Sequence, residues 1–248
     1  MGATRSFETI VYSKFGTIAE VILDRPHVLN AHNIQMRDDL YQVLEAVRDD
    51  SEIYCMVLRG MGERAFCTGA DLTEFGTAPS RVIARQVRWE RDLWGMLQSI
   101  QKPTIAALHG YVLGSGLEMC LLCDLRIASE DAIFGMPEAS LGMTPVACGT
   151  QTMPRNVGMS KTMEILLSNQ RYTASKALEM GLVHRVVERN NLVKETMELA
   201  ETLSSYDPKV IKSIKASINR GMDLPLDKAL ELEIQMASAT MSLEQNNI

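Results

Sequence analysis

Two glutamates lie where a carboxylate can act on a bound molecule. Glu118 and Glu138 each follow a backbone turn, in a region otherwise almost free of acids. Gly114 and two small residues after it mark a tight turn between an apolar strand-like run, 104–112, and an apolar helix-like run, 117–125. The first N–H groups of that helix point at whatever occupies the turn. Because an acid among apolar neighbours is costly to bury, Glu118 is a candidate catalytic residue.

Each acid also has an ordinary structural explanation. An acid near a helix start commonly stabilises the helix dipole, which would account for Glu118 taken alone. Glu138 follows Pro137 and equally fits a solvated loop acid. The pair becomes chemically informative only when its two environments push the pKa values apart, because one group then serves as acid and the other as base.

Four ordered motifs extend the pattern beyond the two acids. They read CTGAD at 67–71, GSGLE at 114–118, CDLRIA at 123–128 and FGMPE at 134–138. In order and spacing they resemble the crotonase superfamily, the enoyl-CoA hydratases and isomerases, and the similarity runs from about residue 16 to residue 244. Their joint occurrence favours catalytic use of both acids over the structural explanations.

The resemblance implies an α/β fold with a crotonase-like spiral core of ββα repeats. A helical C-terminal region follows in this family and mediates trimer formation, and two trimers often stack into a hexamer. We therefore expect a core over residues 1–190. The helical region of the same domain is expected over 191–248, packed on the core or on a neighbouring subunit.

The family chemistry is hydration of a double bond conjugated to a thioester. This needs a base for water, an acid for the α-carbon and donors for the charge on the thioester oxygen. By resemblance, Glu118 activates or positions the water and Glu138 exchanges the proton at the α-carbon. The backbone N–H groups of Ala70 and Ser115 form the oxyanion hole. Ser115 stands where the family usually has a glycine, a change that keeps the backbone donor.

Coenzyme A recognition departs from the usual family pattern. Two positions where the family often has a lysine read His27 and Thr73 here. By resemblance, the backbone and surface of Val28 and Leu29 meet adenine or pantetheine, and the Thr68 carbonyl meets adenine. The full set of expected substrate-binding residues is His27, Val28, Leu29, Thr68, Gly69, Asp71, Leu72 and Gly114.

The turn after the second acid also departs from the family. Where many hydratases have Pro-Gly-x-Gly-Gly-Thr, this chain reads PVACGT at 145–150. Side chains at Val146 and Cys148 are therefore expected to narrow or reshape the acyl end of the pocket.

Composition excludes several classes of protein. The chain has 248 residues, with 46% hydrophobic and 23% charged content, which is ordinary for a globular protein. Its net charge of −6, without a basic tract, provides no electrostatic footprint for nucleic acid. No apolar run reaches the roughly 18 residues needed to span a bilayer, and the N-terminus lacks the apolar core of a signal peptide. We expect a cytoplasmic protein that needs no membrane.

Cysteine and histidine usage indicates packing rather than metal binding. Five scattered cysteines fit reduced core thiols, and the CxxC of Cys120 and Cys123 has no second pair. His109 and His184 sit in apolar runs and are expected in the core. Nothing has the spacing of metal ligands.

Strand-like and helix-like segments alternate up to about residue 158, and helices follow. Alternation with short connections predicts a mostly parallel sheet covered by helices. Expected strands are 7–12, 18–23, 54–59 and 104–112. Expected helices are 33–48 with Asn30 or Asn33 as cap, 80–100 with Val82 and Ile83 inward, 160–167, 173–180 capped by Thr173 and ended by Gly181, 191–204, 208–220 and 226–241.

The resemblance favours an enoyl-CoA hydratase that adds water across the 2,3 double bond of an acyl-CoA in fatty acid metabolism. No cofactor is expected. An isomerase, or a hydratase for a bulky or cyclic acyl-CoA, is the alternative enzyme, because the same oxyanion hole stabilises any CoA enolate. Retention of both acids favours hydration. A family member that binds RNA, or a catalytically silent subunit, is the non-enzymatic alternative, and the acidic balance disfavours the former.

Overall fold

A computed structural model describes residues 4–241, without the side chains of Arg5, Ala84 and Arg88. Its larger sheet has seven strands in the order β1-β2-β3-β4-β6-β8-β11. The strands β1, β2 and β3 are antiparallel, and from β3 onward every pair is parallel. The strands span Thr4–Ser6, Ile10–Phe15, Ile18–Leu23, Cys55–Gly60, Thr104–Leu108, Leu125–Ser129 and Arg185–Val187.

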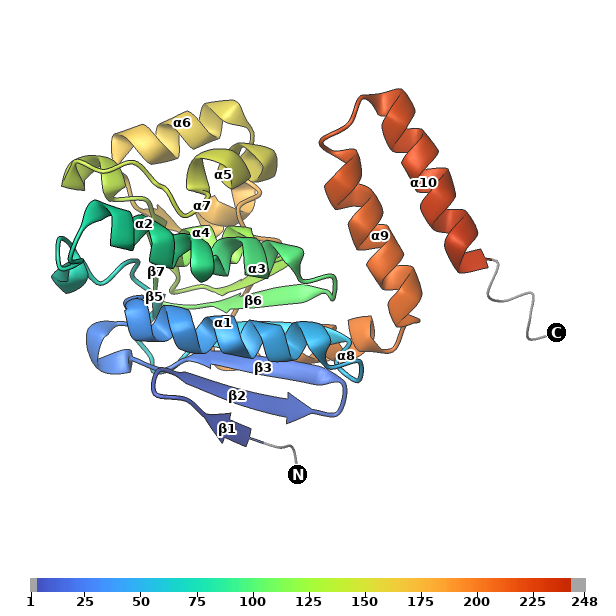
Figure 1. Ribbon diagram of the computed structural model, residues 1–248, viewed down its shortest axis with the longest axis horizontal. Coiled ribbons are helices and arrows are strands. Elements are labelled where there is room, and N and C mark those ends of the chain that lie inside the picture. The colour runs from blue at the N-terminus through green and yellow to red at the C-terminus, as the bar shows by residue number, and fades with distance from the viewer. Residues whose placement is uncertain (1–3, 242–248) are drawn as a thin grey trace.

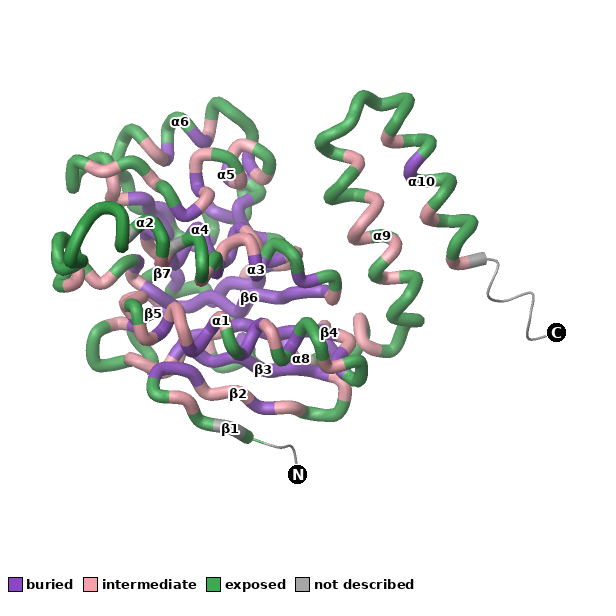
Figure 2. The backbone as a smooth tube through the Cα atoms, in the orientation of Figure 1, coloured by how far each residue is buried: buried purple, intermediate pink, exposed green. Residues whose placement is uncertain are grey.

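Helices cover both faces of this sheet, so most residues of its central strands are buried (Figure 2). All six residues of β3 are buried. On one face, α1 (Ile34–Asp49) packs with Met36, Leu40 and Val43 buried. On the other face, α8 (Leu192–Ser204) packs with Leu192 and Ala200 buried. The predicted parallel α/β core is confirmed. Although α8 lies within the expected C-terminal region, it packs against the sheet as part of this core.

A second, four-stranded sheet lies beside the first, in the order β10-β9-β7-β5. Its strands are β5 (Ala65–Cys67), β7 (Tyr111–Leu113), β9 (Ile133–Gly135) and β10 (Tyr172–Thr173). The prediction of one strand over 104–112 is therefore wrong, because the run divides into β6 and β7, which belong to different sheets. Gly110, with φ +52°, makes the turn, and a Cβ there would collide with the Arg64 carbonyl. The helix expected over 117–125 is also shorter, since β8 begins at Leu125.

The helix predicted over 80–100 is two helices. They are α2 (Arg81–Glu90) and α3 (Leu93–Ser99), and the Asp92 side chain caps α3 by accepting from the Gly95 N–H. Val82 is 73% exposed and Ile83 43%, so the expectation that they face inward is wrong. Because the helix is interrupted at residues 91–92, only α3 packs its apolar residues against the core.

The other expected helices agree closely with the structure, but the helix over residues 149–157 was not expected. Asn33, not Asn30, caps α1 by accepting from the Met36 N–H, and Thr173 caps α7 by accepting from the Lys176 N–H. The first strand of the β2–β3 hairpin begins three residues later than expected, at Ile10. The remaining helices are α4 (Ser115–Leu121), α5 (Gly149–Val157), α6 (Met159–Ser168), α7 (Ala174–Glu179), α9 (Pro208–Gly221) and α10 (Leu226–Met241), with short 3-10 turns at Pro26–Val28, Leu72–Glu74, Glu138–Leu141 and Arg189–Asn191.

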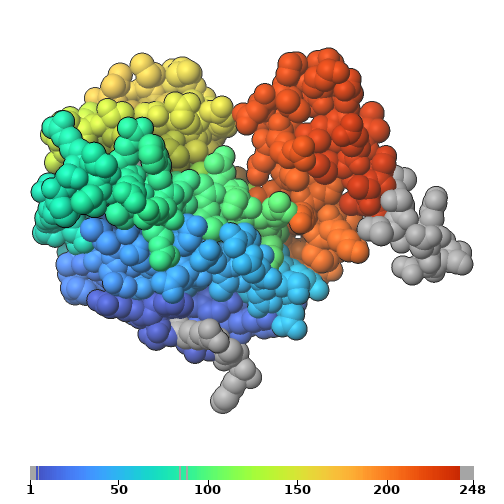
Figure 3. Space-filling model, viewed as in Figure 1, coloured from blue at the N-terminus to red at the C-terminus, as the bar shows by residue number. Residues whose placement is uncertain are grey.

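The last two helices form a hairpin that stands away from the core (Figures 1 and 3). A hollow of about 760 Å³ lies along α9 and α10, and its lining is mostly apolar. Ile214 and Ile218 are more than half exposed there. On the core side, the Lys215 Nζ donates to Asp124 at 2.6 Å and to the Lys102 carbonyl at 2.9 Å. The hairpin thus has an apolar face that the described part of the chain leaves uncovered. The ion pair between Lys215 and Asp124 connects α9 to the core.

Candidate active site

A pocket of about 520 Å³ collects most of the residues expected to do chemistry. Its walls come from the loop after β5, the start of α4, the segment 137–147 and α3. The expected residues that line it are Thr68, Gly69, Ala70, Leu72, Gly114, Ser115, Glu118 and Glu138. Segments nearly seventy residues apart in sequence therefore meet around one cavity.

The two predicted N–H donors lie in adjoining segments. Gly69, with φ +99°, turns the chain so closely against α4 that a Cβ placed on it would be 3.4 Å from the Ser115 nitrogen. Ser115 is the first residue of α4, where the helix leaves the N–H without an internal acceptor. Within residues 4–241, no hydrogen bond occupies the N–H of Ala70 or of Ser115. Both donors are available to a bound oxygen.

Glu118 is 2% exposed and held by backbone donors. Its Oε1 accepts from the Gly149 N–H at 2.7 Å and from the Ala147 N–H at 3.1 Å. Hydrogen bonds to a carboxylate stabilise its charge, and these two fix the orientation of the side chain. The turn of residues 145–150 therefore positions the acid of α4.

Glu138 has a different environment. It opens the 3-10 turn Glu138–Leu141, and its Oε2 is buried with no hydrogen-bond partner in the part of the chain that the structure describes. Burial raises the pKa of this carboxyl, and the nearby Arg171 charge partly offsets the rise. Gly114 lies so close that a Cβ on it would be 2.7 Å from the Glu138 Oε1. The two acids of the pocket are thus held in unlike surroundings.

The expected coenzyme A residues lie partly outside this pocket. His27 and Val28 are exposed in the turn Pro26–Val28, and Leu29 lines a separate hollow with Asn30 and Met61. Asp71 binds the Arg25 Nη1 at 3.0 Å and caps the turn that follows, as expected. The Leu29 carbonyl accepts from the Thr68 N–H at 3.2 Å. The surface segment is therefore tied to the loop that carries Ala70.

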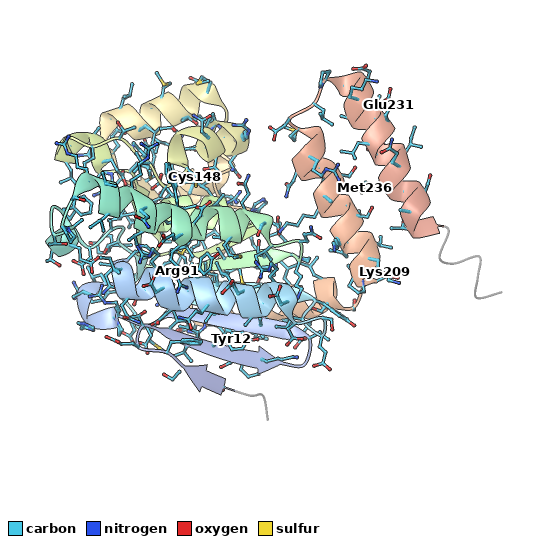
Figure 4. The ribbon with its side chains drawn as sticks, viewed as in Figure 1. Tyr12, Arg91, Cys148, Lys209, Glu231 and Met236 are labelled. Carbon is cyan, nitrogen blue, oxygen red and sulfur yellow. The ribbon has the colours of Figure 1, made fainter. Side chains whose placement is uncertain are left out.

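Of the two residues expected to reshape the pocket, Val146 lines it and Cys148 does not. Cys148 is labelled in Figure 4, and its Sγ donates to the Glu118 carbonyl at 3.7 Å. Burial raises the pKa of this thiol to about 12. The other four cysteines are buried and free, as expected for core thiols. No cluster of His, Cys, Asp or Glu within the described ranges is arranged to hold a metal ion.

Sequence reasoning missed several polar residues of the pocket. They are His32, Arg37, Arg91 and Arg171, together with the aromatic Trp94. A signal was available for His32, which follows the expected coenzyme A residues His27, Val28 and Leu29 by three positions. Of the other histidines, His109 is buried as expected, but His184 is exposed, and its Nδ1 accepts from the Arg126 N–H at 3.1 Å.

Comparison with known proteins identifies the family. The family model described as enoyl-CoA hydratase/isomerase matches residues 14–247. A short-chain-enoyl-CoA hydratase of Clostridium acetobutylicum is 36% identical over 246 residues, 95% of this chain and 90% of that protein. A crotonyl-CoA hydratase of Syntrophomonas wolfei is 32% identical over 229 residues, 92% of this chain and 88% of that protein.

Solved structures agree on the fold. A crystal structure from Geobacillus kaustophilus, described as an enoyl-CoA hydratase subunit I, superposes with a TM-score of 0.90 at 34% identity and covers 98% of this chain and 93% of its own. This chain belongs to the enoyl-CoA hydratase/isomerase family, within the crotonase superfamily, and the resemblance drawn from its motifs is confirmed. No helix among the described residues is long and apolar enough to cross a membrane.

Proposed function

We propose that this chain hydrates 2-enoyl-CoA thioesters. The observation that carries the proposal is the meeting of Glu118, Glu138 and the free N–H groups of Ala70 and Ser115 around one pocket. Enoyl-CoA hydration needs this set of groups. The names of the Clostridium and Syntrophomonas relatives point to the same reaction.

Each group has one step in the proposed reaction. Glu118 positions the water, whose O–H bond breaks as a C–O bond forms at the β-carbon. The electron pair of the double bond moves to the thioester oxygen, where the N–H groups of Ala70 and Ser115 stabilise the charge. Glu138 transfers its proton to the α-carbon, while the Glu118 carboxylate accepts the proton that water releases. Transfer of that proton from Glu118 to Glu138 restores the starting state. Addition of water needs no external oxidant or reductant, so we propose a reaction without a cofactor.

The presence of both acids favours hydration over isomerisation. An isomerase moves one proton between carbons and can use a single acid, whereas hydration also needs a group that positions water. The test is turnover on straight, branched and cyclic 2-enoyl-CoAs and on 3-enoyl-CoAs, with products identified by mass spectrometry. Formation of 3-hydroxyacyl-CoA supports hydration. Isomerisation alone, or no turnover on the whole panel, would contradict it.

A small substitution behind Glu118 tests its positioning. A Cβ at Gly149 would lie 2.8 Å from the Glu118 Oε1, so Gly149→Ala is expected to displace the carboxylate. A shift of that kind costs about tenfold to 100-fold in kcat. Thermal unfolding is measured beside kcat, because the Cβ would also meet the Glu118 Cγ and the Met136 Cε at 3.1 Å. The matched control is Gly221→Ala in α9, whose Cβ would meet Ala229 at an ordinary 3.6 Å. Equal kcat values for both variants would contradict the assigned position.

We also propose that the apolar face of α9 and α10 packs against further copies of this chain, as a trimer or a hexamer. The support is the hollow lined by Val210, Ile214, Ile218, Met222 and Leu230, which a monomer leaves exposed to water. Light scattering should give a trimer or hexamer mass, and Ile218→Asp should lower it. A monomeric wild-type protein would refute the proposal.

We also propose that the protein is located in the cytoplasm, where metabolism supplies acyl-CoA substrates. Fluorescence microscopy of a tagged chain would check this location.

A further inference from the structure

The pocket contains polar side chains that hydration does not use. His32 lies between the turn Pro26–Val28 and α1, and its ring is 5.7 Å from the Trp94 ring of α3. The His32 Nε2 is buried, and no hydrogen-bond partner is found for it in the described part of the chain. A buried ring nitrogen without a partner costs free energy, unless a bound molecule supplies the missing bond.

The position of His32 relative to the oxyanion loop is fixed by the backbone. Its N–H donates to the Gly69 carbonyl at 2.8 Å, and its carbonyl accepts from the Asp71 N–H at 2.9 Å. These bonds place it directly beside Ala70. Because coenzyme A is large and polar, its nucleotide stays toward solvent, and the part of the ligand beside Ala70 is the pantetheine and acyl end. Pantetheine carries no charge, so an anionic group at this wall has to come from the acyl chain.

Three guanidinium groups line the same pocket, those of Arg37, Arg91 and Arg171, and the Arg171 charge acts on Glu138. Arg37 of α1 pairs through Nε and Nη2 with Asp38, at 2.9 and 2.7 Å. Arg91 is labelled in Figure 4, and its guanidinium lies 5.4 Å from the centre of the Tyr41 ring. Tyr41 follows Arg37 by one turn of α1. No described carboxylate lies within 4 Å of the Arg91 guanidinium. Arg91 therefore brings a positive charge to this wall without an acid to balance it.

The carboxylates that line the pocket do not balance the positive charge of Arg91. Among the lining residues the only carboxylates are Glu118 and Glu138, which are the two acids of the proposed reaction. His32 adds no charge of its own, because burial and the Arg37 charge lower its pKa to about 4. At neutral pH it is an uncharged hydrogen-bonding group that feels the charges of Arg37 and Arg25.

We propose that the acyl chain of the substrate ends in a carboxylate, which accepts a hydrogen bond from the His32 Nε2 and pairs with Arg91. This inference rests on the proposed function and specifies the substrate class of the same site. An anion here would satisfy the unpartnered nitrogen and balance the Arg91 charge at once. An apolar acyl chain would leave both unsatisfied, which is why a simple alkyl chain fits this wall less well.

The test uses unreactive ligands, so that binding is measured without turnover. Glutaryl-CoA and pentanoyl-CoA have acyl chains of equal length, and only the first ends in a carboxylate. By isothermal titration calorimetry the wild-type protein is expected to bind glutaryl-CoA at least about tenfold more tightly, as a hydrogen bond to a charged group implies. His32→Leu and Arg91→Gln should each remove most of that preference. Arg85→Gln, which removes an exposed charge of α2 outside the pocket lining, should leave it unchanged.

Equal wild-type affinity for the two ligands would overturn the inference, whatever the variants do. A preference that persists in both His32→Leu and Arg91→Gln would overturn it as well. Hydration of pent-2-enoyl-CoA and of its analogue with a terminal carboxylate separates this inference from the proposed function. Turnover of both at equal efficiency refutes only the carboxylate subsite. A binding preference without turnover of either refutes only the hydratase assignment.

Discussion

Glu138→Gln is expected to lower the rate of hydration by about 100-fold to 10,000-fold, the usual contribution of a positioned general acid or base. Gln keeps the shape of the side chain but has no proton to exchange with the α-carbon. Glu118→Gln should have an effect of similar size, because an amide oxygen positions and activates water less well than a carboxylate. The measurement is steady-state hydration of crotonyl-CoA, with binding of a saturated acyl-CoA measured in parallel.

Binding of the saturated ester should change little in either variant, since the proposed roles of both acids concern proton transfer and water. Circular dichroism and thermal unfolding control for folding. If either variant hydrated the preferred substrate at a rate near that of the wild type, the assignment of the pair would be wrong. A loss of binding equal to the loss of rate would instead indicate a structural role.

The pH dependence follows from the same assignment. Hydration uses the protonated form of Glu138, and burial raises the pKa of this carboxyl above its ordinary 4.5. The hydration rate should therefore fall as the pH rises through that raised pKa. Arg171 lowers the pKa of Glu138, so neutralising Arg171 would move the fall to higher pH. A fall that moved to lower pH would contradict the proposed protonation state.

Ser115→Pro is expected to lower kcat by about 100-fold to 1,000-fold, the usual cost of losing one oxyanion donor. Proline has no N–H to offer the thioester oxygen. At position 115, proline removes the N–H donor at little cost to the helix. Ser115 is the first residue of α4, where a helix tolerates proline because it makes no use of that N–H. Hydration kinetics on the folded variant provide the measurement.

Ser115→Ala and Ser115→Gly are the matched controls, and both should keep most of the activity. The Ser115 Oγ is buried and makes no hydrogen bond with any residue that the structure describes, so its removal breaks no bond of the fold. Circular dichroism and oligomer mass must first show that the proline variant is folded. Normal turnover by a folded Ser115→Pro protein, or complete inactivity of Ser115→Ala, would remove the backbone N–H from the mechanism.

Local patterns in the chain were sufficient for much of the architecture. Helix boundaries at Asn33 and Thr173 follow from side chains that can cap a helix, which is an interaction within one turn. The turn at Gly69 and the cap at Asp71 are equally local. Glu118 and Glu138 could be singled out because their motifs keep family order and spacing, and both line the pocket.

Other features depend on contacts between distant segments. The run 104–112 appears continuous in sequence, yet it divides at Gly110 because β7 pairs with β5 and β9 while β6 pairs with β4 and β8. Likewise, the break at 91–92 exposes α2 and turns α3 toward the core. No single-chain periodicity reports which strand a segment will pair with, since pairing depends on the whole sheet.

By itself, the sequence determined the family, because four motifs keep its order and spacing, and most helix ends, because a cap is an interaction within one turn. It also predicted the two acids and the backbone donors, which line one pocket. Only the tertiary structure decided what else faces the bound molecule. His32 and Arg91 are 59 positions apart in sequence, yet they line one pocket. They line the same pocket because α1, which follows His32, and α3, which follows Arg91, pack together on the larger sheet. Burial of apolar area decides which helices are neighbours there.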